Sequence, residues 1–102
     1  MKEPYIICAA VHYNDGNNYP HQPINIGSGI VIAGRRHHNC FLILGSLLKE
    51  NYNKKLLTED SQGFLTSDDW FVSRKHAYLI AKEAGQILVD HDDKILFSED
   101  LY

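Results

Sequence analysis

The hydrophobic and polar positions of the first third of the chain predict two strands joined by a long loop. Residues 5–13 are mostly apolar on both faces of an extended strand, which is typical of a strand covered on both sides. A turn-forming run follows at residues 14–18, and Pro20 and Pro23 favour an extended loop over a helix. Residues 29–33 form a second apolar run, which we expect to pair antiparallel with the first.

A first helix is predicted from about residue 38 to residue 50. Apolar residues recur there at helical spacing, namely Phe41, Leu44, Leu47 and Leu48. Leu42 and Ile43 widen this apolar face beyond one side of the helix. A helix that is apolar over so much of its circumference fits either a deep core or a contact between copies of the chain. We expect it to serve as both.

A second helix is predicted to begin after Ser73, whose hydroxyl can cap the first free N–H groups. Val72 before it can pack on Ala77 as a hydrophobic staple, and Gly85 is a typical helix end. The expected buried stripe consists of Ala77, Ile80, Ala81 and Ala84.

The remaining segments are shorter and less regular. Residues 51–57 suggest a loop or short turn, and residues 62–67 a short strand or extended loop closed by a turn at 67–69. Residues 90–93 form an acidic, solvated stretch, and residues 95–97 are a candidate short strand. The pattern as a whole predicts one α+β domain over residues 1–102, with a small antiparallel sheet packed against two helices.

Length and charge narrow the classes of partner. A domain of 102 residues buries a modest share of its surface, so self-association is a useful source of extra core, and we expect a homo-oligomer. The formal net charge of −3 argues against DNA as a partner. No run approaches the ~20 apolar residues of a membrane span, and no secretory leader is recognisable. Cys8 and Cys40 both lie in apolar surroundings, which predicts reduced, buried thiols.

The chemistry-bearing residues concentrate where the predicted helices begin. The segment Gly34-Arg35-Arg36-His37-His38-Asn39-Cys40 joins the second strand to the first helix, and Arg74 opens the second helix. All three arginines of the chain are therefore at helix starts, where backbone N–H groups also favour an anion. The plain alternative is a surface arginine pair beside a turn lined by histidines.

Aromatic residues lie near Arg74 and suit a nucleobase, because base stacking on an aromatic ring is worth ~1–3 kcal/mol. Trp70 is expected near the surface and Phe71 in the core, whereas Phe64 fits a ligand site and the core equally well. We expect no catalysis, because no spacing supplies a nucleophile with its base or a metal-ligand set. An enzymatic alternative is a small phosphodiesterase or nucleotide hydrolase that uses His37, His38 and the acidic stretch.

Several blocks, in the same order along nearly the whole chain, resemble the Thoeris anti-defence 1 family of small phage proteins. These blocks are Ile7-Cys8-Ala9-Ala10, Gly34 to Cys40, Gln62-Gly63-Phe64-Leu65-Thr66-Ser67, Phe71-Val72 with Arg74-Lys75 and Ala77, Ala84-Gly85-Gln86-Ile87 and Ser98-Glu99-Asp100-Leu101. The chain departs from the family pattern at Ser73 and at Asp69-Trp70, the latter on the expected pocket rim.

The resemblance implies a non-enzymatic sponge that sequesters cyclic ADP-ribose isomers, and in some members cyclic oligonucleotides, in the cytoplasm of the infected bacterial host. We expect no cofactor, and the expected homo-oligomer is a dimer or a larger assembly such as a hexamer. The candidate ligand-binding residues are Arg35, Arg36, His37, His38, Gln62, Phe64, Thr66, Trp70 and Arg74. Among the arginines we expect Arg36 and Arg74 to contact a pyrophosphate. A protein-binding phage accessory factor, whose arginines pair with a partner's carboxylates, is the remaining alternative.

Overall fold

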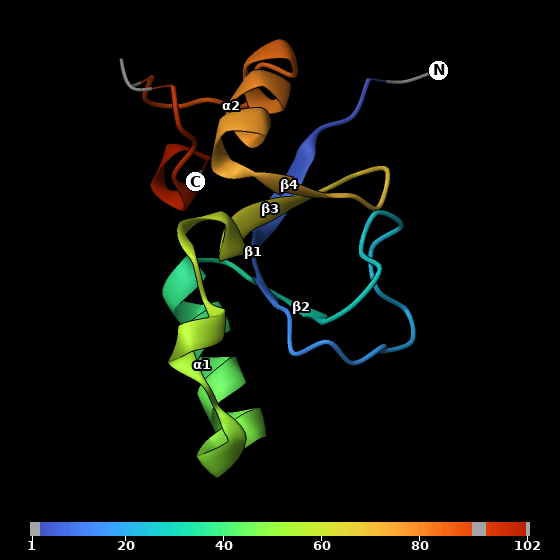
Figure 1. Ribbon diagram of the computed structural model, residues 1–102. Coiled ribbons are helices and arrows are strands. Elements are labelled where there is room, and N and C mark those ends of the chain that lie inside the picture. The colour runs from blue at the N-terminus through green and yellow to red at the C-terminus, as the bar shows by residue number, and fades with distance from the viewer. Residues whose placement is uncertain (1–2, 91–93, 102) are drawn as a thin grey trace.

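The computed structural model describes residues 3–90 and 94–101 and shows a four-stranded antiparallel sheet with two helices (Figure 1). The predicted α+β architecture is therefore confirmed. The regular elements are β1 (Ile6–Tyr13), β2 (Ile30–Gly34), α1 (His37–Leu48), β3 (Gln62–Thr66), β4 (Phe71–Ser73) and α2 (Arg74–Glu83). Short 3-10 helices are formed by Lys49–Asn51, Lys54–Leu56, Glu59–Ser61 and Ser98–Asp100.

The strand order is β2-β1-β3-β4, so β1 is an interior strand with neighbours on both sides. Ala9 pairs with Gly34 of β2 and with Phe64 of β3. A register shift between Ile6 and Cys8 bends the first part of β1. Both edges of β1 are therefore hydrogen-bonded, while the apolar residues on its faces are explained by the elements that pack on the sheet.

Both helices pack on the same face of the sheet. Ala9, Val11 and Tyr13 alternate along β1 and share that face. One core cluster joins the sheet to α2, and its fully buried members include Ala9, Phe64, Ala77, Ala81 and Leu96. A second joins the sheet to α1 and consists of Val11, Tyr13, Cys40 and Leu44. The helix starts are thereby fixed against the middle of the sheet.

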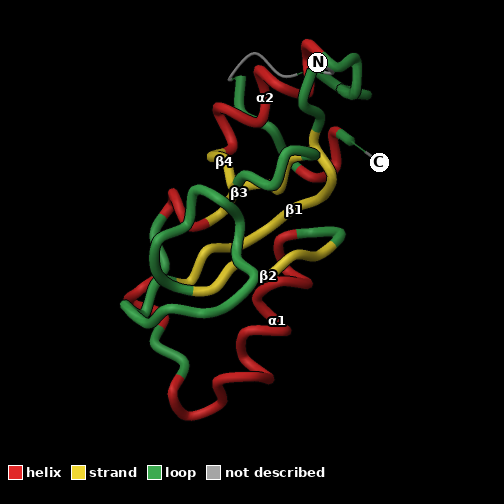
Figure 2. The backbone as a smooth tube through the Cα atoms, turned by 90° about the vertical axis from the view of Figure 1, so that its right-hand side faces the viewer, coloured by secondary structure: helices red, strands yellow, loops and turns green. Residues whose placement is uncertain are grey.

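The loop of residues 14–29 covers the opposite face, standing in front of the sheet in Figure 2. Its Asn25 side chain accepts from the Phe71 N–H at 2.9 Å and donates to the Phe71 carbonyl at 2.7 Å. At the other edge, Gln22 Oε1 accepts from the Val31 N–H at 2.8 Å. Amide side chains therefore take up backbone groups on both edge strands of the sheet.

The lack of a side chain at Gly63 allows β3 to lie close to β4. A Cβ atom there would lie 2.1 Å from the Val72 carbonyl oxygen and 2.7 Å from Cζ of Phe71. Phe71 is buried, as expected, and its ring centroid is 5.7 Å from that of His12. The close approach of β3 to β4 thus depends on the missing side chain.

Several expectations need correction. Residues 95–97 are not a strand, although Leu96 is fully buried and its N–H donates to the Arg74 carbonyl at 3.1 Å. Ala84 is exposed, and Tyr78 is buried beside Ala77 and Ala81 instead, because the buried face is rotated toward the C-terminal segment. β4 was missed because its three residues resemble a lead-in to α2. The loop or short turn expected at residues 51–57 is confirmed as short 3-10 turns, and the predicted acidic stretch at residues 90–93 lies outside the described residues except for Asp90.

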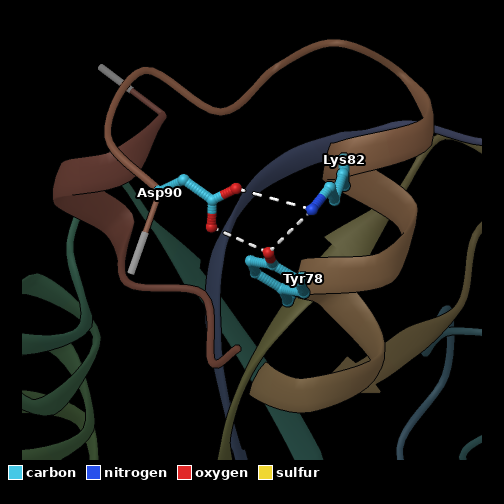
Figure 3. A network of polar contacts seen from close by, with 3 residues as sticks. All are labelled: Tyr78, Lys82 and Asp90. Atoms are coloured by element: carbon cyan, nitrogen blue, oxygen red, sulfur yellow. Dashed lines mark hydrogen bonds and ion pairs between the residues drawn. The ribbon is translucent and has the colours of Figure 1, made fainter. Parts of the chain in front are cut away.

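The boundaries of α2 follow the prediction. The Ser73 hydroxyl accepts from the His76 N–H at 3.2 Å, and Gly85 leaves the helix with a φ of 69°. Beyond it, the chain is tied back to α2 by Tyr78, whose hydroxyl donates to Asp90 at 2.7 Å and accepts from Lys82 at 3.3 Å (Figure 3). In the part of the chain that the structure describes, none of the helices has the length and apolar character needed to cross a bilayer.

Cys40 is buried as expected, whereas Cys8 is only half-buried, and both are free thiols. Burial is the main cause that raises the pKa of the Cys40 thiol to about 11. This thiol is therefore protonated at neutral pH, as is typical of a structural cysteine.

Candidate functional site

Both helices begin with basic residues. Arg35 and Arg36 precede α1, which opens with His37 and His38, while α2 opens with Arg74, Lys75 and His76. Neither helix has an acidic residue in its first turn. Because a helix N-terminus carries partial positive charge, a cation there costs ~0.3–1 kcal/mol. Basic residues at the helix N-termini therefore lower the stability of the fold slightly and make these positions favourable for binding an anion.

The start of α2 opens onto a cleft of about 250 Å³, which we call the α2 cleft. It is lined by Glu59, Asp60, Gln62, Ser73, Arg74, Lys75 and Ile95. The sheet builds this juxtaposition, because β4 runs directly into α2 and Gly63, next to Gln62, pairs with Ser73. Gln62 and Arg74, which were both predicted as site residues, are therefore brought together.

Arg74 is held in place from several sides. Its side chain is only 19% exposed, and its guanidinium carbon lies 5.9 Å from the centroid of the Phe97 ring. Its Nη2 atom is 3.8 Å from Oε1 of Glu59, whose side chain is 89% exposed. An ion pair this long and this exposed on one side contributes little, ~0–1 kcal/mol. The guanidinium is thus preorganised, while the carboxylate can be displaced.

His37 is the first residue of α1 and is not among the residues that line the α2 cleft. Its Nε2 atom is 2.8 Å from the Gly63 carbonyl, and its ring meets that of Phe64 edge-on at 5.1 Å. A carbonyl only accepts, so we assign the proton to Nε2. Burial is the main cause that lowers the His37 pKa, with Arg74 adding to this effect and the Gly63 hydrogen bond and Glu99 opposing it. His37 is therefore neutral near pH 7 and anchors α1 to β3.

The other predicted residues lie in different surroundings. Phe64 is fully buried in the core, so its ring offers no face to a ligand in this arrangement. Arg35 and His38 are exposed at the start of α1. Arg36 is half-buried, and its backbone N–H donates to Oδ1 of Asn39 at 3.0 Å.

Thr66 and Trp70 line a second cleft, also about 250 Å³, on another side of α2. The other residues of this cleft are Pro4, Asp68, Val72, His76 and Ile80. Trp70 is 44% exposed, whereas Thr66 is buried. The Thr66 hydroxyl donates to Asp68 and accepts from the Trp70 N–H at 3.1 Å, so its hydrogen-bonding capacity is used within the hairpin turn.

Residues 5–102 match the family model described as the Phage T4 y16D protein. The chain belongs to the phage T4 y16D protein family. Comparisons with curated proteins and with solved structures found no match. Membership of a phage protein family agrees with the phage origin expected from the sequence, and nothing in the match connects this family with Thoeris anti-defence.

In this y16D family member, sequence reasoning missed three ionised residues of the α2 cleft. Lys75 had a usable signal, since it follows Arg74 in a helix start without acidic residues. Glu59 and Asp60 had no signal in the sequence, because only the tertiary structure, through a 3-10 turn before β3, brings them next to α2. Among the described residues, no group of three or more His, Cys, Asp or Glu side chains is placed to hold a metal ion.

Proposed function

We propose that this phage protein captures a compact nucleotide-type anion, such as a cyclic ADP-ribose isomer, at the α2 cleft and withholds it without degrading it. The infected bacterial cytoplasm, where such signals are made, is the proposed place of action. The observation that carries the proposal is the start of α2, where Arg74 and Lys75 face a cleft in the absence of a first-turn carboxylate.

The chemistry of the cleft suits a phosphate next to a sugar. Backbone N–H groups of the first turn and the guanidinium of Arg74 can donate to phosphate oxygens. Glu59 and Asp60 can accept from ribose hydroxyl groups, which a bare polyphosphate lacks. The two cations and two carboxylates balance, so the cleft favours a ligand that offers both an anion and hydroxyl donors.

The size of the cleft limits what one chain holds. A volume of about 250 Å³ is below the ~300–1,000 Å³ of typical small-molecule pockets. The cleft therefore fits the phosphate and part of the sugar, and the rest of the ligand extends past its rim. A pocket completed by a second copy of the chain would bury the remainder.

Capture is favoured over hydrolysis by the state of His37. Its Nε2 atom is hydrogen-bonded to the Gly63 carbonyl, and its half-buried ring packs edge-on against Phe64. The hydrolase alternative also uses residues 91–93, which lie outside the described residues. The proposal needs neither a base nor a nucleophile.

The decisive experiment follows the fate of the ligand. The protein is incubated with cyclic ADP-ribose isomers, free ligand is removed by filtration, and the bound fraction is released by heat and chromatographed. Intact nucleotide in the bound fraction supports capture, a changed product supports hydrolysis, and no depletion contradicts both.

Variants then locate the site. Arg74→Ala should lose ~2–5 kcal/mol of binding, mostly through the off-rate, and Arg74→Lys should restore only part of it. Glu59→Gln removes the negative charge that competes for Arg74 and keeps an oxygen that can accept from a ribose hydroxyl, so it should tighten phosphate binding. Lys55→Ala, an exposed cation outside the cleft, is the matched control. Parental affinity in a folded Arg74→Ala variant would exclude the α2 cleft as the site.

A further inference from the structure

The surface of α1 is unlike that of an ordinary solvent-facing helix. Its twelve residues contain no Asp, Glu, Lys or Arg. Only Cys40 and Leu44 are buried, whereas Leu42 is 67%, Leu47 62% and Ile43 40% exposed. A helix facing water on this much of its surface normally carries charged side chains there. We call Leu42, Ile43, Ser46 and Leu47 the α1 face.

The α1 face has the shape that close helix packing needs. Leu42 and Ser46 form one row at a spacing of four residues, and Ile43 and Leu47 form the next. Gly45 lies beside them, and a Cβ atom at Gly45 would meet nothing within 4 Å. Ser46 lies between Leu42 and Ile43 on this surface, and its small side chain leaves a gap that can accept a side chain of another helix.

The fold also leaves this face projecting. α1 runs away from the sheet, with residues 49–61 returning along one side of it (Figures 1 and 2). Tyr52 and Leu57 of that return pack on the α1 core cluster. The α1 face remains uncovered in one chain.

We propose that the α1 face is the contact between two copies of this chain, related by a two-fold axis that passes near Ser46. Identical uncharged rows are self-complementary, which a two-fold interface requires. The helix has no charge to steer a charged protein partner, and it lacks the Lys and Arg of helices that lie on membranes. This inference does not depend on the proposed ligand.

Pairing through the sheet edges is a less favourable route to a dimer. Asn25 occupies the outer N–H and carbonyl of Phe71 on β4, and Gln22 occupies the outer N–H of Val31 on β2. An added strand would have to displace these amides. The helix surface carries no such competitor.

The exposed apolar area of the α1 face determines the dimer affinity that we expect. The three aliphatic side chains expose on the order of 300 Å² per copy, which is comparable to the largest apolar patch of a typical monomer. A standard interface buries ~800 Å² per partner, so the polar flank of α1 must form the rim. We therefore expect a dimer with a micromolar dissociation constant.

Sedimentation velocity of the full chain, from ~1 to ~200 µM, tests the dimer. Leu47→Glu places two like charges across the axis and should weaken the dimer at least ~100-fold while leaving the fold intact. Leu79→Glu on α2 is the matched control, since Leu79 is 61% exposed against 62% for Leu47. A parent that stays monomeric, or two glutamate variants that dimerise equally well, would overturn the proposal.

Disulfide cross-linking tests the position of the two-fold axis near Ser46 without relying on a destabilised dimer. Under mild oxidation, Ser46→Cys should give a covalent dimer, whereas the parent and Glu83→Cys on α2 should not. Both substituted positions are exposed, so neither should disturb the core. Equal cross-linking of Ser46→Cys and Glu83→Cys would show random collision and contradict the interface.

Discussion

α1 and α2 lie on the same face of one sheet, yet the side chains that they expose to solvent differ. α2 buries Ala77, Tyr78 and Ala81 and faces water with charged residues such as Lys82 and Glu83. α1 buries only Cys40 and Leu44 and turns Leu42, Ile43 and Leu47 outward. α2 thus leaves one large apolar side chain, Leu79, exposed among charged residues, whereas α1 exposes three large apolar side chains with no charged residue between them.

The largest effect is expected where α2 touches the sheet. Ala81 has no exposed surface, so Ala81→Leu should overpack the contact and cost ~1–3 kcal/mol of unfolding free energy. Ala84→Leu is the control, because Ala84 is exposed at the end of the same helix and should change stability by less than ~0.5 kcal/mol. Urea unfolding measures both. Equal losses would show that the two helix positions are not distinguished by burial.

An intermediate effect on stability is expected from replacing one glycine of each helix region, Gly45 in α1 and Gly85 after α2. A Cβ atom at Gly45 of α1 or at Gly85 after α2 would meet nothing within 4 Å, but only Gly85 has a positive φ, of 69°. Gly45→Ala should therefore stabilise the chain by ~0.5–1 kcal/mol, and Gly85→Ala should destabilise it. Both changes are read from thermal unfolding.

The same Gly45→Ala variant sharpens the contrast between stability and association. Gly45 borders the α1 face next to Leu42, so a methyl group there should crowd the helix contact and weaken self-association while it strengthens the helix. A variant that gains stability and keeps the parental dissociation constant would place the helix crossing elsewhere on α1.

The smallest effect concerns how α1 is attached to the sheet. The His37 pKa in the folded chain is lowered, mainly by burial, so the unfolded chain takes up the proton first on acidification. The stability contribution of neutral His37 is present above its unfolded pKa of ~6.5 and is lost as the pH falls through the folded pKa. Urea unfolding between pH ~7.5 and ~5 should show this loss.

His37→Gln is expected to flatten that pH dependence, because an amide can donate to the Gly63 carbonyl without titrating. His38→Gln changes the exposed neighbouring position and serves as the control. An unchanged slope in His37→Gln would mean that another group dominates the acid sensitivity of the fold.

Local features of the fold were predictable from the sequence. The strand at β1 follows from apolar residues on both faces, and the start of α2 follows from the Ser73 cap. β4 was not predictable, since three residues carry no period and the strand depends on pairing with β3 and on the Asn25 amide. Leu96 lies in a short apolar run, which resembles a strand in the sequence. It is buried without regular structure, and the sequence has no periodic pattern that distinguishes this case from a strand.

The candidate site divides in the same way. Arg74 at a helix start is a local feature and was found, whereas its neighbour Glu59 is positioned by tertiary structure and was not. Phe64 shows the limit most clearly. Its sequence neighbours suit a ligand site and a core equally, and only its pairing opposite Ala9 on the helix-covered face assigns it to the core.

The interior position of β1 has a consequence for synthesis of the chain. Among the four strands that the structure describes, β1 comes earliest in the sequence, and it pairs with two strands that are made later, β2 at residues 30–34 and β3 at residues 62–66. Until β3 emerges, one edge of β1 has no native partner, although the strand is among the most apolar segments of the chain. Chains that have not yet exposed β3 outside the ribosome should therefore be the species that chaperones bind and that aggregate when translation stalls.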